Sequence, residues 1–222
     1  MSNIGSYEER MEDFDWSIAE RELGYKDGDE INIGWYCSDR ICNMGNGDRL
    51  ALLWENASGE EKRFTYNDIR VYSNAISAFL RKLGLKNEER VCLFMDRVPE
   101  LYIGLLGILK IGAVAQPLFS AFGDESLFVR LENAGTSAII TQRKHVSKVR
   151  KIIDRLPNLK HIIIVDHDGK KELKEREIPF SMEAERVDKL EIQPTKAESP
   201  SLLHYTSGTT GLPRVCNMST IR

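Results

Sequence analysis

The stretch from residue 205 to residue 214, YTSGTTGLPR, is the most informative part of the sequence. The four hydroxyls of its Ser and Thr residues can donate hydrogen bonds to phosphate oxygens, and its one guanidinium offers a planar fork that matches them. Its two glycines allow close approach of the backbone, so that consecutive N–H groups can converge on an anion. We therefore predict a phosphate-binding loop, and a flexible turn rich in Ser, Thr and Gly is the alternative. The candidate binding residues are Thr206, Ser207, Gly208, Thr209, Thr210, Gly211 and Arg214.

The elements before this loop alternate between short β-rich runs and amphipathic helical patterns. Strands separated by single helices require crossover connections, which give a mostly parallel, doubly wound α/β sheet with helices on both faces. We expect strands at 91–95, 113–117, 137–141, 161–165 and 201–205, and helices at 99–111, 124–134 and 144–156. The loop then follows the carboxyl end of a parallel strand, which is where open α/β sheets bind ligands.

A β-hairpin and a long helix precede the alternating region. The apolar runs 50–54 and 63–66 flank a stretch that contains Asn, Ser and Gly, which is the pattern of a hairpin. Thr65 and Asp68 have the spacing of a capping box, and apolar residues at spacings of three and four follow them as far as Leu83. We expect a helix over this range.

The string YTSGTTGLPR closely resembles the phosphate-binding signature of the adenylate-forming superfamily, which includes the acyl-CoA synthetases. It does not have the spacing of a Walker A loop. Shorter similarities narrow the resemblance to acetyl-CoA synthetase-like enzymes, and they lie at 31–33, 39–40, 64–66, 84–86, 90–91, 99–101, 111–114 and 119–122. The resemblance implies that the seven candidate residues bind the phosphates of ATP. Arg214 stands where the family has Lys, which keeps the charge but changes the donor geometry.

The resemblance also implies a two-step ligase reaction. A carboxylate attacks the α-phosphate of ATP, which is bound with Mg²⁺, to give acyl-AMP and pyrophosphate, and the thiol of CoA then displaces AMP. The partners of the protein would thus be a small carboxylic acid, ATP and CoA. Departure of pyrophosphate concentrates negative charge, which preorganised N–H groups, hydroxyls and a cation can stabilise. No catalytic residue and no metal ligand of the protein is assigned in this chain.

By the same resemblance, residues 1–45 form an N-terminal extension and residues 46–222 form part of a large AMP-binding domain. The charge-balanced stretch 170–191 is expected to be a solvated loop or surface helix. After Pro213 the family pattern breaks, and the segments for adenine, ribose and the adenylation lysine do not follow. We expect a truncated chain that is inactive alone. A non-catalytic nucleotide-binding or interaction module, complemented by a separate partner, is the alternative.

The last residues suggest a cause for this break. Back-translation of 215–221 with one G restored gives codons that permit Gly-(Val/Met/Leu)-Gln-His-Val-His, which closely matches the continuation expected from the family. A one-nucleotide deletion near Arg214 would explain the match and make the chain a vestigial frameshifted product, and coincidence is the alternative. A sheet that stops there would leave an unpaired edge and exposed apolar surface, which predicts self-association or capture of a partner.

Composition and charge exclude several other classes of function. With 31 basic and 34 acidic residues the net charge is −3, so no surface for nucleic acid or for an anionic membrane is expected. The most apolar window, 101–119, is interrupted by Lys110 and Pro117 and fails the requirement of about 20 apolar residues for a membrane span. The N-terminus lacks the apolar stretch of a secretory signal, and the four scattered cysteines fit reduced thiols. We expect a cytoplasmic protein.

Three other side chains near the loop or the sheet edge are weaker candidates for functional residues. His204 stands at the end of a predicted strand, where a packed or backbone-bonded histidine is expected rather than a catalytic one. By resemblance, residues 119–122 border the acyl or pantetheine channel. The pattern itself favours Phe119 and Phe122 as core aromatics.

Overall fold

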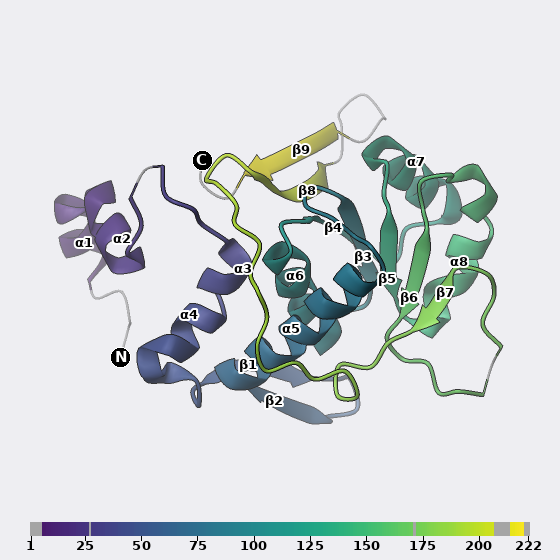
Figure 1. Ribbon diagram of the computed structural model, residues 1–222, viewed down its shortest axis with the longest axis horizontal. Coiled ribbons are helices and arrows are strands. Elements are labelled where there is room, and N and C mark those ends of the chain that lie inside the picture. Colours follow the sequence, from purple (N-terminus) through teal and green to yellow (C-terminus); the bar gives the residue numbers. More distant parts are fainter. Residues whose placement is uncertain (1–5, 27, 171, 207–213, 220–222) are drawn as a thin grey trace.

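The computed structural model describes residues 6–26, 28–170, 172–206 and 214–219, and its centre is a seven-stranded sheet (Figure 1). The strands lie in the order β7-β6-β5-β3-β4-β8-β9. Their bounds are β3 Arg90–Met95, β4 Val114–Phe119, β5 Ala138–Thr141, β6 His161–Ile164, β7 Glu177–Pro179, β8 Pro200–Thr206 and β9 Arg214–Ser219. Neighbouring strands are parallel except β8 and β9, which are antiparallel. The predicted mostly parallel sheet is therefore confirmed.

Helices cover both faces of this sheet, as the alternation of strands and helices predicts. They are α5 (Tyr66–Lys82) and α6 (Pro99–Lys110) on one face, and α7 (Asp124–Ala134) and α8 (Val146–Arg150) on the other. On β3, the side chains of Val91, Leu93 and Met95 pack with the first pair of helices, and those of Cys92 and Phe94 pack with the second. Successive side chains of a strand point to opposite faces, so a strand buried on both sides must be apolar throughout. Within the described ranges, no helix is long and apolar enough to cross a membrane.

Helix α5 begins at the predicted capping box and packs closely against α6. The Thr65 hydroxyl accepts a hydrogen bond from the Asp68 N–H (3.2 Å), and the Asp68 carboxylate accepts one from the Thr65 N–H (2.8 Å). Where the two helices meet, a Cβ on Gly107 would lie 2.8 Å from Ile76 Cγ2. The Ser77 hydroxyl donates to the Gly107 carbonyl oxygen (2.7 Å). The missing side chain of Gly107 thus permits this close approach of α6 to α5.

The predicted hairpin is present as a separate two-stranded antiparallel sheet. Its strands are β1 (Leu50–Glu55) and β2 (Glu61–Thr65), and they lie beside α5 (Figure 1). In the turn, the Asn56 side chain accepts hydrogen bonds from the N–H groups of Ser58 and Glu60 (3.0 and 2.9 Å). The Asn56 side chain thus takes the place of a backbone acceptor for these two N–H groups, which stabilises the turn.

Among the described residues, five short helical segments precede the hairpin, and they are α1 (Tyr7–Asp13), α2 (Trp16–Leu23), α3 (Ile33–Tyr36), α4 (Asp39–Ile41) and η1 (Cys42–Asn46). Helices α1 and α2 lie to one side, whereas α3 packs on α6 (Figure 1). The Asn32 amide donates to the Leu109 carbonyl oxygen (2.9 Å), and the buried ammonium of Lys110 lies 2.5 Å from Asp39 Oδ2. Buried polar contacts therefore fix residues 31–41 to the main body.

The charge-balanced stretch 170–191 differs from the expected solvated loop. Its residues Glu177–Pro179 form the edge strand β7, and Phe180 and Met182 are only 5% and 8% exposed. The Phe180 ring packs against that of Phe79 on α5, with 4.8 Å between the ring centroids. Two apolar side chains among many charges produce no periodic pattern, so the expectation was wrong for this part of the stretch.

The predicted helix at 144–156 is broken in the structure. It consists of a 3₁₀ turn at Arg143–His145, α8 at Val146–Arg150 and a second 3₁₀ turn at Ile153–Arg155. The apolar pattern remains valid, because the buried side chains of this segment are Val146, Val149, Ile152 and Leu156. Short 3₁₀ turns keep nearly the same buried face as an α-helix, so periodicity does not reveal the break.

Candidate functional site

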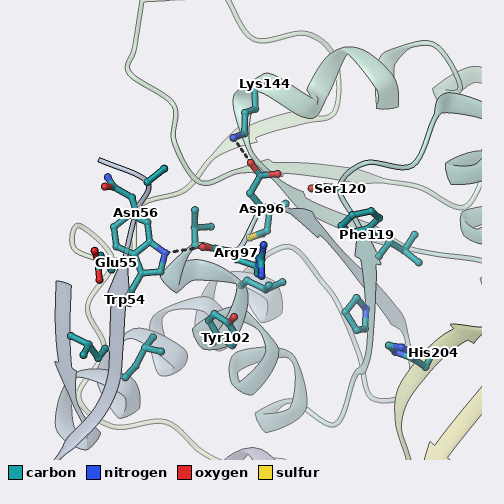
Figure 2. Close-up of a pocket in the computed structure, with 18 residues that line it drawn as sticks. Trp54, Glu55, Asn56, Asp96, Arg97, Tyr102, Phe119, Ser120, Lys144 and His204 are labelled. Carbon is teal, nitrogen blue, oxygen red and sulfur yellow. Dashed lines mark hydrogen bonds and ion pairs between the residues drawn. The ribbon is translucent and has the colours of Figure 1, made fainter. Parts of the chain in front are cut away.

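A pocket of about 1140 Å³ opens at the carboxyl edge of the sheet (Figure 2). It is lined by the ends of β3 and β4, by β1 of the hairpin and by the first turn of α6. Lys144 of the segment after β5 and His204 of β8 complete the lining. The loops that follow parallel strands meet at this edge, which is why ligands of open α/β sheets bind there.

Asp96 links three elements in this pocket. It follows β3 directly, and its carboxylate forms an ion pair with Lys144 (Figure 2). The same carboxylate lies 2.8 Å from His145 Nε2. Its N–H is 2.9 Å from Gln142 Oε1, to which it donates. The ammonium of Lys144 and the hydroxyl of Ser120 hold the pKa of Asp96 well below its usual range. The carboxylate is therefore charged at neutral pH, and it orders the segments that follow β4 and β5.

Trp54 holds the hairpin against the sheet. Its indole N–H donates to the Arg97 carbonyl oxygen (2.7 Å), so β1 is fixed to the turn between β3 and α6 (Figure 2). The Lys62 ammonium lies 5.6 Å from the centroid of the indole ring, within the range of a cation–π contact. The hairpin thus forms a wall of the pocket whose position relative to the sheet is set by a side chain.

Large apolar side chains in the pocket are open to solvent. Leu53, Tyr102 and Phe119 are 52%, 43% and 68% exposed. The expectation that Phe119 is a core aromatic is wrong, because its ring meets Phe122 edge-on (6.0 Å) but otherwise lines the pocket. His204 is also exposed and lines the pocket rather than packing in the core. Such a surface fits an organic ligand or another protein segment.

The structure describes only part of the predicted phosphate-binding loop. Thr206 ends β8 and Arg214 begins β9, and the two residues are opposite each other in the antiparallel ladder. Outside the described residues lie Ser207, Gly208, Thr209, Thr210 and Gly211, together with the side chain of Arg214. Because β8 runs parallel to β4, the connection between β8 and β9 starts at the same sheet edge as the pocket.

Two polar residues of the pocket, Asp96 and Lys144, were not predicted as site residues and belong to no motif, whereas Ser120 lies in the stretch 119–122 that the resemblance assigns to the border of the acyl or pantetheine channel. Asp96, Ser120 and Lys144 lie on three separate segments. One signal could have identified the first two, since each directly follows a strand of the sheet. The carboxyl ends of parallel strands meet at one edge, so the residues after them are candidates for a shared site.

The described residues do not fit a resident metal ion. In this part of the chain, no group of three or more His, Cys, Asp or Glu side chains is placed to hold a metal. The carboxylate of Asp96, which could offer oxygen ligands, is already paired with Lys144 and His145. Mg²⁺ is usually held by carboxylates together with water and substrate phosphates. No metal ion is therefore assigned to the described residues as a resident ligand.

Comparisons with known proteins identify the family of the chain. Residues 41–221 match the model of the family described as AMP-binding enzyme. The acetyl-coenzyme A synthetase of Bacillus subtilis strain 168 is 33% identical over 96% of this chain and 36% of its own length. The 3-hydroxypropionyl-coenzyme A synthetase of Sulfurisphaera tokodaii is 29% identical over 84% of this chain and 30% of its own length.

A solved structure has the same fold. The acyl-CoA synthetase of Brucella canis has a TM-score of 0.81 and 26% identity to this chain, and the match covers 96% of this chain and 38% of that one. The chain thus spans about a third of the length of the relatives it matches. The family model covers well over half of the residues and includes both the pocket and the β8–β9 connection. The chain therefore belongs to the AMP-binding enzyme family.

Proposed function

We propose that this chain is part of an AMP-forming acyl-CoA synthetase that acts on a small carboxylic acid. A carboxylate oxygen attacks the α-phosphorus of ATP, and the bond to the oxygen that bridges to the β-phosphate breaks, so that pyrophosphate leaves with the electron pair. The sulfur of CoA then attacks the acyl carbon, and AMP leaves. The names of the two relatives, an acetyl- and a 3-hydroxypropionyl-coenzyme A synthetase, support a small acid as the substrate.

The observation that carries this proposal is the placement of Thr206 and Arg214. They flank the β8–β9 connection at the sheet edge where the pocket opens. We assign the phosphates of ATP to the hydroxyls, backbone N–H groups and guanidinium of Thr206, Ser207, Gly208, Thr209, Thr210, Gly211 and Arg214. Donors fixed in advance around a departing pyrophosphate lower the energy of the transition state because its charge develops next to them.

The domain organisation is part of the same proposal. Residues 1–45 serve as an extension, and residues 46–222 form part of the AMP-binding domain. The isolated chain binds the nucleotide but does not turn it over. The lack of turnover is supported by the length of the match, since the chain spans only about a third of its relatives. Adenylation requires both reactants to be held in place, and such positioning supplies much of the catalysis.

Two assays on the purified chain test these statements. Calorimetry with Mg-ATP should detect binding that is weakened about tenfold to a hundredfold by Thr206→Ala, because one hydrogen bond to a charged oxygen is lost. ATP–pyrophosphate exchange with acetate should stay at background. Absence of Mg-ATP binding would refute the nucleotide site, and robust exchange would refute the inactivity of the isolated chain.

A second candidate function is that of an interaction module, and the edge strand β9 favours it. Among the described strands, none pairs with the outer edge of β9, and its Val215 and Met218 are 45% and 47% exposed. Free strand edges with apolar side chains pair readily with other chains. Self-association or complementation by a separate polypeptide is the expected result. Light scattering that shows a clean monomer at high concentration would contradict self-association.

We also propose that the protein works in the cytoplasm. All four cysteines are free, and they are Cys37, Cys42, Cys92 and Cys216. Free thiols are typical of proteins from a reducing compartment. Fractionation of the native cells that finds the chain outside the cytoplasm would contradict this location.

A further inference from the structure

Tyr205 ties the end of β8 to helix α7. Its hydroxyl lies 2.9 Å from the Arg130 carbonyl oxygen and 3.0 Å from Asn133 Oδ1, and it donates its proton to this pair of acceptors. Burial raises the pKa of the Tyr205 phenol, so the group keeps its proton at neutral pH. Tyr205 directly precedes Thr206, so this bond acts one residue before the first candidate phosphate ligand.

The side chain of Arg130 strengthens the same contact. Its guanidinium carbon lies 4.2 Å from the centroid of the Phe122 ring and 5.7 Å from that of the Tyr205 ring. Its Nη1 donates to the Ser126 carbonyl oxygen (2.8 Å), whereas its Nε is buried without a hydrogen-bond partner. A cation within reach of the faces of two aromatic rings is attracted to both. The phenol ring of Tyr205 is therefore held by a cation–π contact as well as by its hydroxyl.

Strand β4 also contacts this junction, by which we mean the contact of Tyr205 on β8 with Arg130 and Asn133 on α7. The contact is made by Gln116, which is fully buried. Its Nε2 donates to the Arg130 carbonyl oxygen (3.0 Å), which thus receives a second side-chain donor besides Tyr205. The Thr136 hydroxyl donates to Gln116 Oε1 (2.6 Å) and fixes the orientation of the amide. The direct ladder between β4 and β8 is short, with Ala115 opposite Leu202. The end of β8 is thus held by its antiparallel ladder with β9 and, towards the rest of the sheet, by side-chain contacts through α7.

Side chains along β8 alternate between the two faces of the sheet, and this links the Tyr205 contact to the pocket. Leu203 is buried and shares a face with Tyr205, whereas His204 lines the pocket. Successive side chains of a strand point to opposite faces, so Thr206 lies on the same face as His204. A displacement of Tyr205 from α7 would thus move or rotate Thr206 relative to the pocket.

We propose that Tyr205 is a positioning residue for nucleotide binding: its contact with α7 holds Thr206 where the phosphate-binding residues begin. This inference rests on the proposed function, because it takes Thr206 as a ligand of the ATP phosphates. Tyr205 itself touches no substrate, since its side chain is committed to α7 on the opposite face of the sheet from His204. Its effect on affinity is therefore exerted through the backbone of β8.

The experiment compares Tyr205→Phe with Tyr72→Phe in the 222-residue chain. Both remove a single hydroxyl, but Tyr72 lies on α5, in the core on the other face of the sheet. Calorimetry with Mg-ATP measures affinity, and hydrogen exchange of residues 202–206 measures how firmly β8 is held. Tyr205→Phe should weaken Mg-ATP binding about threefold to tenfold and speed exchange at the end of β8. Tyr72→Phe should change neither, even if both variants lose similar thermal stability.

Each contrary outcome refutes a different step. Unchanged exchange at residues 202–206 in Tyr205→Phe would refute the anchor itself. Faster exchange with unchanged Mg-ATP affinity would refute the positioning role, because the anchor would then be merely structural. If the unmodified chain binds no Mg-ATP, the proposed function fails and the positioning role fails with it, while the exchange data still decide whether Tyr205 anchors β8. An equal loss of affinity in Tyr72→Phe would also overturn the proposal, since general destabilisation would explain both.

Discussion

Replacement of Asp39 should destabilise the fold strongly at neutral pH, because it leaves a buried charge without its counterion. The side chain of Lys110 is 0% exposed, and its ammonium lies 2.5 Å from Asp39 Oδ2 and 2.7 Å from Asn74 Oδ1. Burial lowers the pKa of Lys110, and the nearby charge of Arg70 lowers it further. The carboxylate of Asp39 opposes both effects, so the charged form of Lys110 in the folded state depends on it.

The expected loss for Asp39→Asn is about 3 to 5 kcal/mol in the free energy of unfolding near pH 7, the range for breaking a buried ion pair by removing one partner. The pH dependence follows from the direction of the shift. A lysine whose pKa is lower in the folded than in the unfolded state binds more protons when unfolded, so stability rises with pH up to the unfolded pKa. Asp39→Asn lowers the pKa of Lys110 further. Its deficit relative to the unmodified chain should therefore shrink as the pH rises from 7 towards 10.

Urea denaturation at about pH 7 and about pH 9.5 measures both quantities. The double variant Asp39→Asn/Lys110→Met should recover much of the loss, since apolar replacement of a buried pair is often neutral or stabilising. Glu61→Gln is the matched control, because Glu61 pairs with Arg63 on the surface and such pairs contribute about 0 to 1 kcal/mol. A loss below about 1 kcal/mol for Asp39→Asn, or a deficit that grows with pH, would refute the reasoning.

Three further predictions follow from other contacts. Gly107→Val should cost more than about 2 kcal/mol in urea denaturation, because the new side chain meets Ile76 and the backbone of α5. Gly123→Ala, which has open space around it, should cost less than about 1 kcal/mol, the difference between Gly and Ala as the N-cap of α7. Asp96→Asn should flatten the decline in stability between about pH 5 and about pH 2, because a carboxylate whose pKa is lowered by folding loses its stabilising contribution only as the pH falls from its unfolded pKa towards its folded pKa. Urea denaturation at both pH values checks this. Met218→Lys should reduce any self-association seen by light scattering, because a charge on an exposed edge strand opposes pairing.

The sheet and its two helical layers could be predicted because each of their elements carries its own signal. The run in β3 is apolar at every position between Val91 and Met95, as a strand buried on both faces requires. The start of α5 is marked by Thr65 and Asp68, whose capping box forms as expected. These are local rules, so a single sequence is enough to apply them.

The strand β7 and the buried residues that follow it depend instead on contacts between distant segments. Glu177 is buried because it forms an ion pair with Arg150 (2.6 Å), and Phe180 is buried because α5 presents Phe79 to it. Neither partner is near in sequence, and the surrounding charges hide the pattern. Periodicity alone therefore predicts a solvated loop where the tertiary structure forms an edge strand.

For this pocket, the sequence predicts where a site should lie, at the carboxyl edge of the sheet, but it does not predict which side chains contact one another there. Asp96, Ser120 and Lys144 stand after β3, β4 and β5 in the chain, and the sequence contains no direct sign that they meet. In the sheet, β3 lies between β4 and β5, so the residue that follows β3 is flanked by the segments that follow both neighbours. A carboxylate at that position is then within reach of a hydroxyl on one side and an ammonium on the other. The contacts of Asp96 thus follow from strand order, which crossover connections restrict but do not by themselves determine.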